Sequence, residues 1–102
     1  MQLNDIDTLK KAIAVYGEES QIDMAIEEMS ELIQALLKYK RTTRQTLFFA
    51  WDYEIIKRNI SEETADVLIM LEQIMMIFDN RSQVEDYIGS KIKRLKRRLD
   101  NK

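Results

Sequence analysis

With 102 residues, of which 45% are hydrophobic and 33% charged, the chain is long enough for one domain and one core. It contains no cysteine and no histidine, which excludes disulfides, thiolate metal sites and Ser–His or Cys–His nucleophiles, so catalysis would have to use carboxylates, cations and water. The net charge of −2 conceals an asymmetry: residues 91–102 hold seven Lys or Arg and one Asp, a net +6, which leaves −8 on residues 1–90.

Neither a membrane span nor a signal peptide is predicted. No apolar run approaches the roughly 18–20 residues that a span requires. The N-terminal residues lack the basic stretch and apolar core of a signal peptide. These two absences and the lack of cysteine favour a cytoplasmic protein with no membrane partner. The length favours a single domain over residues 1–102.

Two helices are predicted in the first 40 residues from the spacing of apolar side chains. The first covers residues 4–16 and ends at Gly17, since glycine commonly follows a helix C-terminus. The second begins at Ser20, where Ser20 and Asp23 resemble a capping box, and continues to about residue 40.

Two more helices are predicted in the second half of the chain. One begins at Ser61, a good N-cap residue, and runs to about residue 80. The other covers residues 82–99, with Ser82 and Glu85 as a second capping box. The expected fold class is all-α, a four-helix bundle.

An acidic word occurs twice in these helical segments. Glu-Glu-x-x-Glu occupies residues 27–31, and Glu-Glu-x-x-Asp occupies residues 62–66, about 35 positions later. Both copies lie in apolar, helix-periodic surroundings rather than in polar loops. Carboxylates are costly to bury unless a positive charge meets them, so the two words predict a divalent cation site.

A helical wheel at about 100° per residue shows on which side of each helix the acidic side chains lie. Glu28 and Glu63 each fall within the apolar face of their helix, and the acidic residue three positions later, Glu31 or Asp66, lies at its edge. The first glutamate of each word falls towards solvent. Two helices therefore present an acidic pair at matching depth, and Mg²⁺ or Mn²⁺ is the kind of ion that prefers such oxygen ligands.

The acidic words have two other interpretations. A solvated helix face would be favoured for either word alone, but the pairing and the apolar surroundings favour a metal site. A di-iron carboxylate bundle normally requires Glu-x-x-His pairs, and the chain has no histidine.

At these residues the sequence resembles the MazG-like all-α nucleoside triphosphate pyrophosphohydrolase superfamily, whose signature is EExxE followed by ExxD. The likeness extends through residues 17–21 before the first word and Lys91-x-x-Arg94 after the second, and so covers most of the chain. One departure is the 31 residues between Glu31 and Glu63, a longer gap than many members have.

The resemblance implies a four-helix bundle completed by oligomerisation, as a homodimer or homotetramer. It also implies Mg²⁺-dependent hydrolysis of a (deoxy)nucleoside triphosphate between the α- and β-phosphates, which releases a monophosphate and pyrophosphate. The family pattern assigns the metal to Glu28, Glu31, Glu63 and Asp66. Mg²⁺ would screen the polyphosphate and lower the pKa of a bound water, with Glu31 and Glu63 as the catalytic carboxylates and Glu31 as the proton acceptor.

The last predicted helix combines an apolar stripe with a basic flank that includes Lys91 and Arg94. These two cations are candidate ligands for substrate phosphate oxygens. The alternative is a solvated basic face that complements the negative helix C-terminus. A nucleic-acid tail is a further option, but the acidic remainder of the chain argues against an extended basic surface.

The insert over residues 41–59 has no clear period and is rich in aromatic residues and threonine; residues 46–57 could form a short helix. Trp51 is the candidate for stacking on a nucleobase, with packing at a subunit interface as the alternative. Gln21 is a candidate base or ribose contact by family position only. The role of the insert stays open.

The sequence is consistent with three functions. The first is a house-cleaning nucleoside triphosphate pyrophosphohydrolase, and the second is phosphoribosyl-ATP pyrophosphatase, which shares the acidic words. The third, of a different class, is a helical module that binds nucleotides without cleaving them. Retention of all four acidic residues favours the enzymes.

Overall fold

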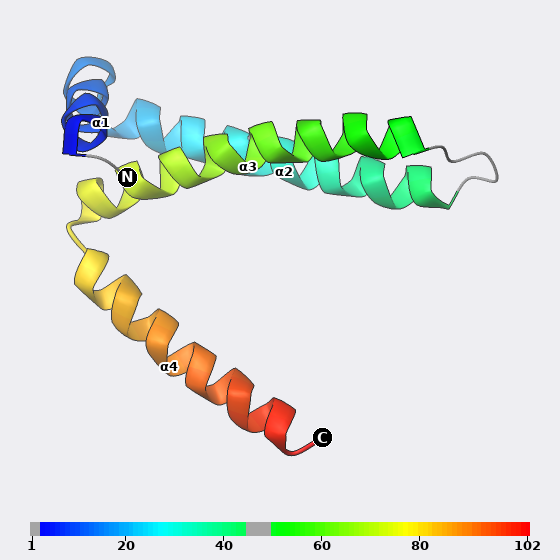
Figure 1. Cartoon of the computed structure of the whole chain (residues 1–102). Coiled ribbons are helices and arrows are strands. Elements are labelled where there is room, and N and C mark those ends of the chain that lie inside the picture. The colour runs from blue at the N-terminus through cyan, green and yellow to red at the C-terminus, as the bar shows by residue number, and fades with distance from the viewer. Residues whose placement is uncertain (1–2, 45–49) are drawn as a thin grey trace.

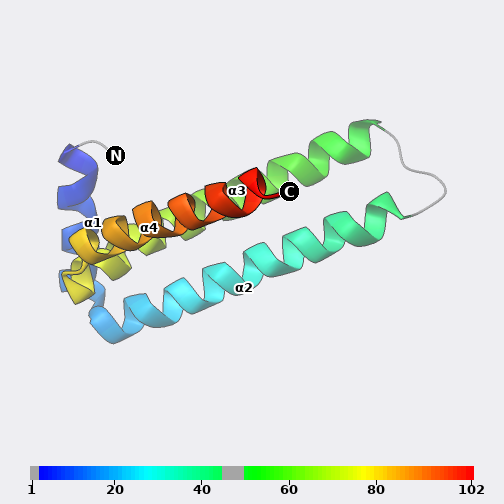
Figure 2. The same ribbon diagram turned by 90° about the horizontal axis from the view of Figure 1, so that it is seen from below.

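The computed structural model describes residues 3–44 and 50–102, which form four α-helices and no strands: α1 (Leu3–Tyr16), α2 (Glu18–Thr43), α3 (Ala50–Phe78) and α4 (Arg81–Asp100). The predicted all-α class is confirmed. The long helices α2 and α3 lie side by side and antiparallel, α1 packs against one end of the pair, and α4 leaves the other helices at an angle (Figure 1). Figure 2 shows the α2–α3 hairpin from below.

The core lies between α2 and α3 and beneath α1. Its buried apolar residues are few: Leu9, Ala25, Ile56, Val67 and Met70. No large side chain among the described residues is fully buried. The radius of gyration is 17.5 Å, compared with about 13 Å for a compact domain of this length, so the single chain is extended.

Gly17 joins α1 to α2, as the sequence predicts. Its φ of 92° lies in a region that residues with a Cβ rarely adopt, and its N–H donates to the carbonyl of Ile13 at 2.9 Å. The predicted capping box at Ser20 is wrong, because α2 already begins at Glu18. The carbonyl of Gly17 accepts from the N–H of Gln21 at 3.1 Å, which starts the helix without a side-chain cap.

The predicted start of the third helix at Ser61 is also wrong. α3 begins at Ala50, and the Ser61 hydroxyl donates within the helix to the carbonyl of Lys57 at 2.7 Å. Thr64 does the same to the carbonyl of Ile60 at 2.7 Å. A hydroxyl that bonds back one turn satisfies itself inside a helix, so Ser61 interrupts nothing.

Most of the predicted insert is helical. Residues 41–43 complete α2, and the residues from Ala50 onwards belong to α3 rather than to a separate short helix. The backbone of Trp51 lies in the first turn of α3. Its side chain lies outside the described part of the structure, as do Phe48 and Phe49, so the predicted stacking role of Trp51 stays a prediction.

An elbow separates α3 from α4. Asp79 adopts a φ of 48°, and the N–H of Asn80 donates to the carbonyl of Met75 at 3.3 Å, which ends α3. Arg81 then forms an ion pair with Glu72 across the elbow. The predicted Ser82 cap is wrong: α4 begins at Arg81, and its N-cap position is Asn80, two residues before Ser82, with no side-chain cap.

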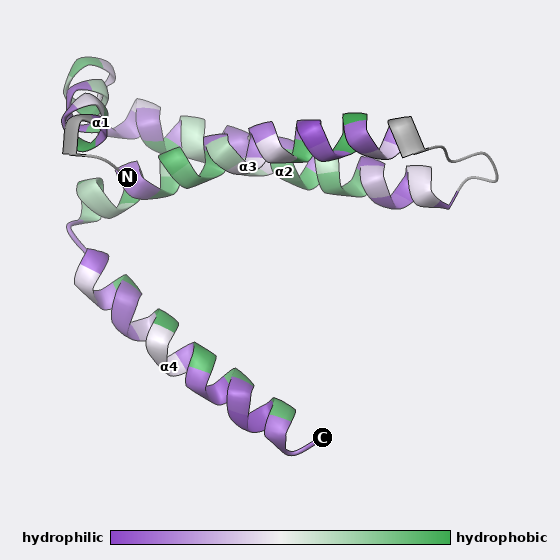
Figure 3. Cartoon of the chain, viewed as in Figure 1, coloured by the Kyte–Doolittle hydropathy of each residue, from purple (hydrophilic) through white to green (hydrophobic). Residues whose placement is uncertain are grey.

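Because α4 points away from the other helices, one chain alone does not form the predicted four-helix bundle. Figure 3 shows hydrophobic segments recurring along one edge of α4, next to hydrophilic ones. This apolar stripe is exposed; its large members are Ile88, Ile92, Leu95 and Leu99. None of the described helices has an apolar stretch long enough to cross a membrane.

Candidate metal centre

The register of α2 against α3 is marked by a pair of buried amides. The Nε2 group of Gln21 donates to Oε1 of Gln73 at 2.6 Å, and these side chains are only 7% and 3% exposed. Gln73 Nε2 also lies 3.8 Å from the sulfur of Met70. The predicted substrate contact Gln21 is therefore engaged inside the chain.

The same register places the two acidic words opposite each other. Because the helices run antiparallel, seven residues forward from Gln21 and seven residues back from Gln73 bring Glu28 across from Asp66. Three residues further along each helix, Glu31 comes across from Glu63. Seven residues are close to two helical turns, and three residues fall about 60° short of one turn, so these carboxylates lie on the shared face or at its edge.

Three of the four carboxylates form a tight cluster. Glu28, Glu31 and Glu63 are half-buried, and one oxygen from each can be chosen so that all three lie within 4.8 Å of one another. Asp66 is exposed and is not part of this group. The first glutamate of each word, Glu27 and Glu62, is exposed, in agreement with the wheel.

Two oxygens in the cluster lack partners. Oε2 of Glu28 and Oε2 of Glu63 are buried, and neither accepts a hydrogen bond from any residue that the structure describes. Leaving a carboxylate oxygen buried and unsatisfied is costly, and the cost is largest for the charged form.

Glu28 and Glu63 therefore hold their protons more tightly than isolated carboxylates do. Burial, followed by the charges of Glu31, Asp66 and Glu63, raises the pKa of Glu28 above its usual 4.5. Burial, followed by the charge of Glu31, raises the pKa of Glu63 in the same way. Burial and like charges both disfavour ionisation, and a nearby cation would reverse both effects.

The donor set fits a hard divalent cation. Three carboxylates from two helices offer oxygen ligands, and two of their buried oxygens have no hydrogen-bond partner within the described part of the chain. Mg²⁺ and Mn²⁺ both accept such ligands and usually retain waters. Glu28, Glu31 and Glu63 would hold the ion, and Asp66 would contribute from the rim through its charge.

The predicted phosphate ligands lie elsewhere in the single chain. Lys91 and Arg94 are exposed on α4, where they line a shallow depression together with Tyr87, Ser90 and Arg97. Since α4 diverges from the α2–α3 pair, one chain does not bring these cations onto the carboxylates (Figure 1).

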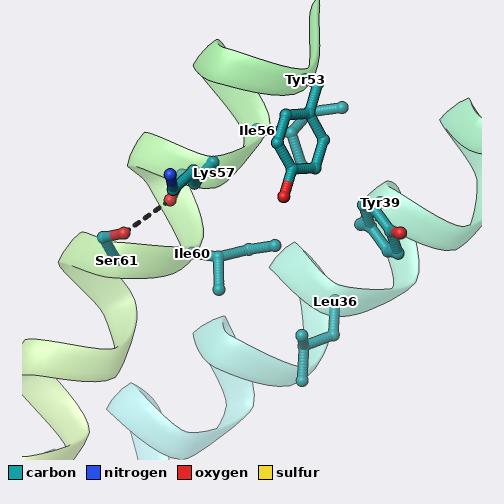
Figure 4. A pocket seen from close by; sticks show the side chains of 7 residues that line it. All are labelled: Leu36, Tyr39, Tyr53, Ile56, Lys57, Ile60 and Ser61. Carbon is teal, nitrogen blue, oxygen red and sulfur yellow. Dashed lines mark hydrogen bonds between the residues drawn. The ribbon is translucent and has the colours of Figure 1, made fainter.

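An apolar pocket that the sequence did not indicate lies beside the carboxylates. It is formed between α2 and α3, towards their connection, and is lined by Leu36, Tyr39, Tyr53, Ile56, Lys57, Ile60 and Ser61 (Figure 4). The helical spacing of Tyr53, Ile56 and Ile60 could have revealed this face, had α3 been extended through the insert.

Comparisons with known protein families, with curated proteins and with solved structures return no match for this chain. The acidic words and the geometry of the cluster are therefore the features that bear on what this protein does.

Proposed function

We propose that this protein is a Mg²⁺-dependent nucleoside triphosphate pyrophosphohydrolase. The observation that supports the proposal best is the cluster of Glu28, Glu31 and Glu63, in which two buried oxygens lack partners. A hard cation would satisfy these oxygens and neutralise the charge that the cluster concentrates. The same residues belong to the EExxE and ExxD words on which the family resemblance rests.

Each carboxylate has a proposed role. Glu28 and Glu63, whose unpartnered oxygens are buried, hold the cation between α2 and α3. Glu31, which lies beside Glu28 and Glu63 in the cluster, takes the proton from the attacking water. When bound, the ion supplies positive charge to the polyphosphate and makes water more acidic. The bond broken is the one between the α-phosphorus and the bridging oxygen to the β-phosphate.

The test is pyrophosphate release from a panel of canonical and modified nucleoside triphosphates, with Mg²⁺ or Mn²⁺. Glu63→Gln removes a proposed ligand and should abolish release. Glu62→Gln is the matched control, since it makes the same change one residue away on an exposed side chain. Unchanged release in Glu63→Gln, or no release from any nucleotide by the wild type, would contradict the proposal.

The same assay separates the two alternatives. Release from phosphoribosyl-ATP alone would identify the phosphoribosyl-ATP pyrophosphatase. Thermal stabilisation by nucleotides without turnover would identify a nucleotide-binding module. The acidic cluster favours a metal-dependent reaction over binding alone, because binding a polyphosphate does not require three carboxylates gathered at one point, two of which, Glu28 and Glu63, have raised pKa values.

We also propose that the protein acts as a homo-oligomer, the smallest form being a homodimer. The single chain has an accessible surface of 8366 Å², whereas a compact protein of its mass has about 6,000 Å². The difference exceeds the roughly 800 Å² that each partner buries in a stable interface. In such an assembly, α4 of one copy could bring Lys91 and Arg94 to the carboxylates of the other.

Light scattering on a size-exclusion column tests the oligomer. Ile92→Lys places a charge on the exposed apolar stripe of α4 and should yield monomers with reduced activity. Gln83→Lys adds the same charge on α4 away from the stripe and should leave the oligomer intact. A monomeric wild type would contradict this proposal.

A further inference from the structure

The apolar pocket lies next to the carboxylate cluster along the same two helices. Ile60, which lines the pocket, precedes Glu63 by three residues, a rise of about 4.5 Å. Ile56, which is buried at 6% exposure, lies four residues before Ile60, about 6 Å further along α3. The pocket thus begins about one helical turn from the cluster and extends away from it.

The lining suits a flat, partly polar ring. Tyr39 from α2 and Tyr53 from α3 stand on its two sides (Figure 4). Along their helices, Leu36 and Ile60 come between these tyrosines and the acidic words. The two tyrosines are 37% and 44% exposed, so their rings are accessible. Aromatic faces stack on any nucleobase with little regard to its identity.

Two polar groups lie at the edge of the pocket nearer α3. Lys57 contributes a cation, and the Ser61 hydroxyl, which donates to the carbonyl of Lys57, keeps its oxygen lone pairs available as acceptors. An apolar concavity with a few polar groups is the usual form of a small-molecule site.

We propose that this pocket binds the nucleobase of the nucleotide whose phosphates meet the cation at Glu28, Glu31 and Glu63. The proposal depends on the function proposed above and specifies how the substrate lies: phosphates at the carboxylates, sugar beside Ile60 and Ser61, base between Tyr39 and Tyr53. The cavity of about 260 Å³ is smaller than the roughly 300–1,000 Å³ of sites that enclose whole drug-sized ligands. It therefore has room for a ring rather than for an entire nucleotide.

The experiment measures equilibrium binding of α,β-imido deoxynucleoside triphosphates, which resist cleavage, and of inorganic tripolyphosphate, both with Mg²⁺. Tyr53→Ala should weaken binding of the imido nucleotides by about tenfold, because base stacking is lost, and should leave tripolyphosphate binding unchanged. Tyr53→Phe keeps the ring and should bind nearly as the wild type does. Tyr39→Ala repeats the test from α2.

Ile55→Ala is the matched control: Ile55 is 44% exposed, as Tyr53 is, lies two residues away on α3 and does not line the pocket. Helix content by circular dichroism verifies that each variant is folded. If the wild type binds imido nucleotides and both tyrosine variants bind them as Ile55→Ala does, the pocket proposal is overturned while the proposed function stands. Equal weakening of tripolyphosphate overturns it too. A wild type that neither binds nor cleaves any nucleotide overturns both proposals.

Discussion

Gln21 on α2 donates a hydrogen bond to Gln73 on α3, and this contact joins residues 52 positions apart in the sequence. Both amides are buried, so the bond is satisfied only when the two helices meet in one register. That register is also the one that faces Glu31 towards Glu63. The amide pair and the acidic cluster thus depend on the same alignment of α2 with α3.

Replacement of Gln21 by Leu should destabilise the protein by about 1–3 kcal/mol, because Gln73 is left buried without its partner. The double variant Gln21→Leu/Gln73→Leu should recover much of that loss, since neither amide then lacks a partner. Urea denaturation of both single variants and of the double variant measures the coupling. Additive losses would show that the two amides act independently.

Glu63→Gln should raise the melting temperature of the metal-free protein by a few degrees at pH 7.5. The substitution removes one charge from a cluster in which burial and neighbouring carboxylates raise the pKa of Glu63. The same variant should bind Mn²⁺ at least about tenfold more weakly, since even residues that only support ligands contribute that much. Calorimetry on Glu63→Gln and on the exposed Glu62→Gln checks both effects, and Glu62→Gln should show neither.

The stability of the metal-free protein should fall as the pH rises above about 4.5. The pKa values of Glu28 and Glu63 are higher in the folded state than their usual 4.5, so the folded state binds protons more tightly. Their contribution is fully present below pH 4.5 and is lost as the pH rises through the raised values. Melting curves between pH 4 and 8 should therefore show that added Mg²⁺ stabilises the protein at pH 7–8 and has little effect near pH 4. Stabilisation that does not depend on pH would contradict the cluster as the site of binding.

The two glycines should respond in opposite ways to substitution by alanine. Gly17→Ala should cost about 1 kcal/mol, because a Cβ is strained at a φ of 92° even though nothing lies within 4 Å of it. Gly89→Ala should stabilise the protein by about 0.5–1 kcal/mol, since Gly89 is inside α4, where a Cβ also meets nothing. Thermal denaturation of the two variants measures these changes in stability. Equal changes in both variants would contradict the strain that we assign to a Cβ at position 17.

The sequence was sufficient to predict the four helices and the inward positions of Glu28 and Glu63, because both follow from periodicity along a single helix. It was also sufficient for Gly17, whose backbone conformation only glycine adopts readily. These features are local. The position of each residue around a single helix is enough to predict them.

The remaining features depend on contacts between distant residues or on ambiguous side chains. Ser61 suits an N-cap and a helix interior equally, and only its bond to the carbonyl of Lys57 shows which applies. The partnership of Gln21 with Gln73 leaves no local pattern in the sequence. The direction of α4 depends on the elbow at Asp79 and on the Glu72–Arg81 ion pair, so periodicity could not supply it.

The continuity of α3 from Ala50 to Phe78 fixes the angular phase between its two functional stretches. Because no break separates Tyr53 from Glu63, one inserted residue between them would rotate the tyrosine by about 100° relative to the carboxylate and shift it by about 1.5 Å. A hinge would absorb such a change, whereas an unbroken helix passes it on in full. Sequence variation between these two residues should therefore arise by substitution rather than by insertion or deletion. The unbroken helix α3 fixes both the distance and the relative orientation of the side chains that bind along it.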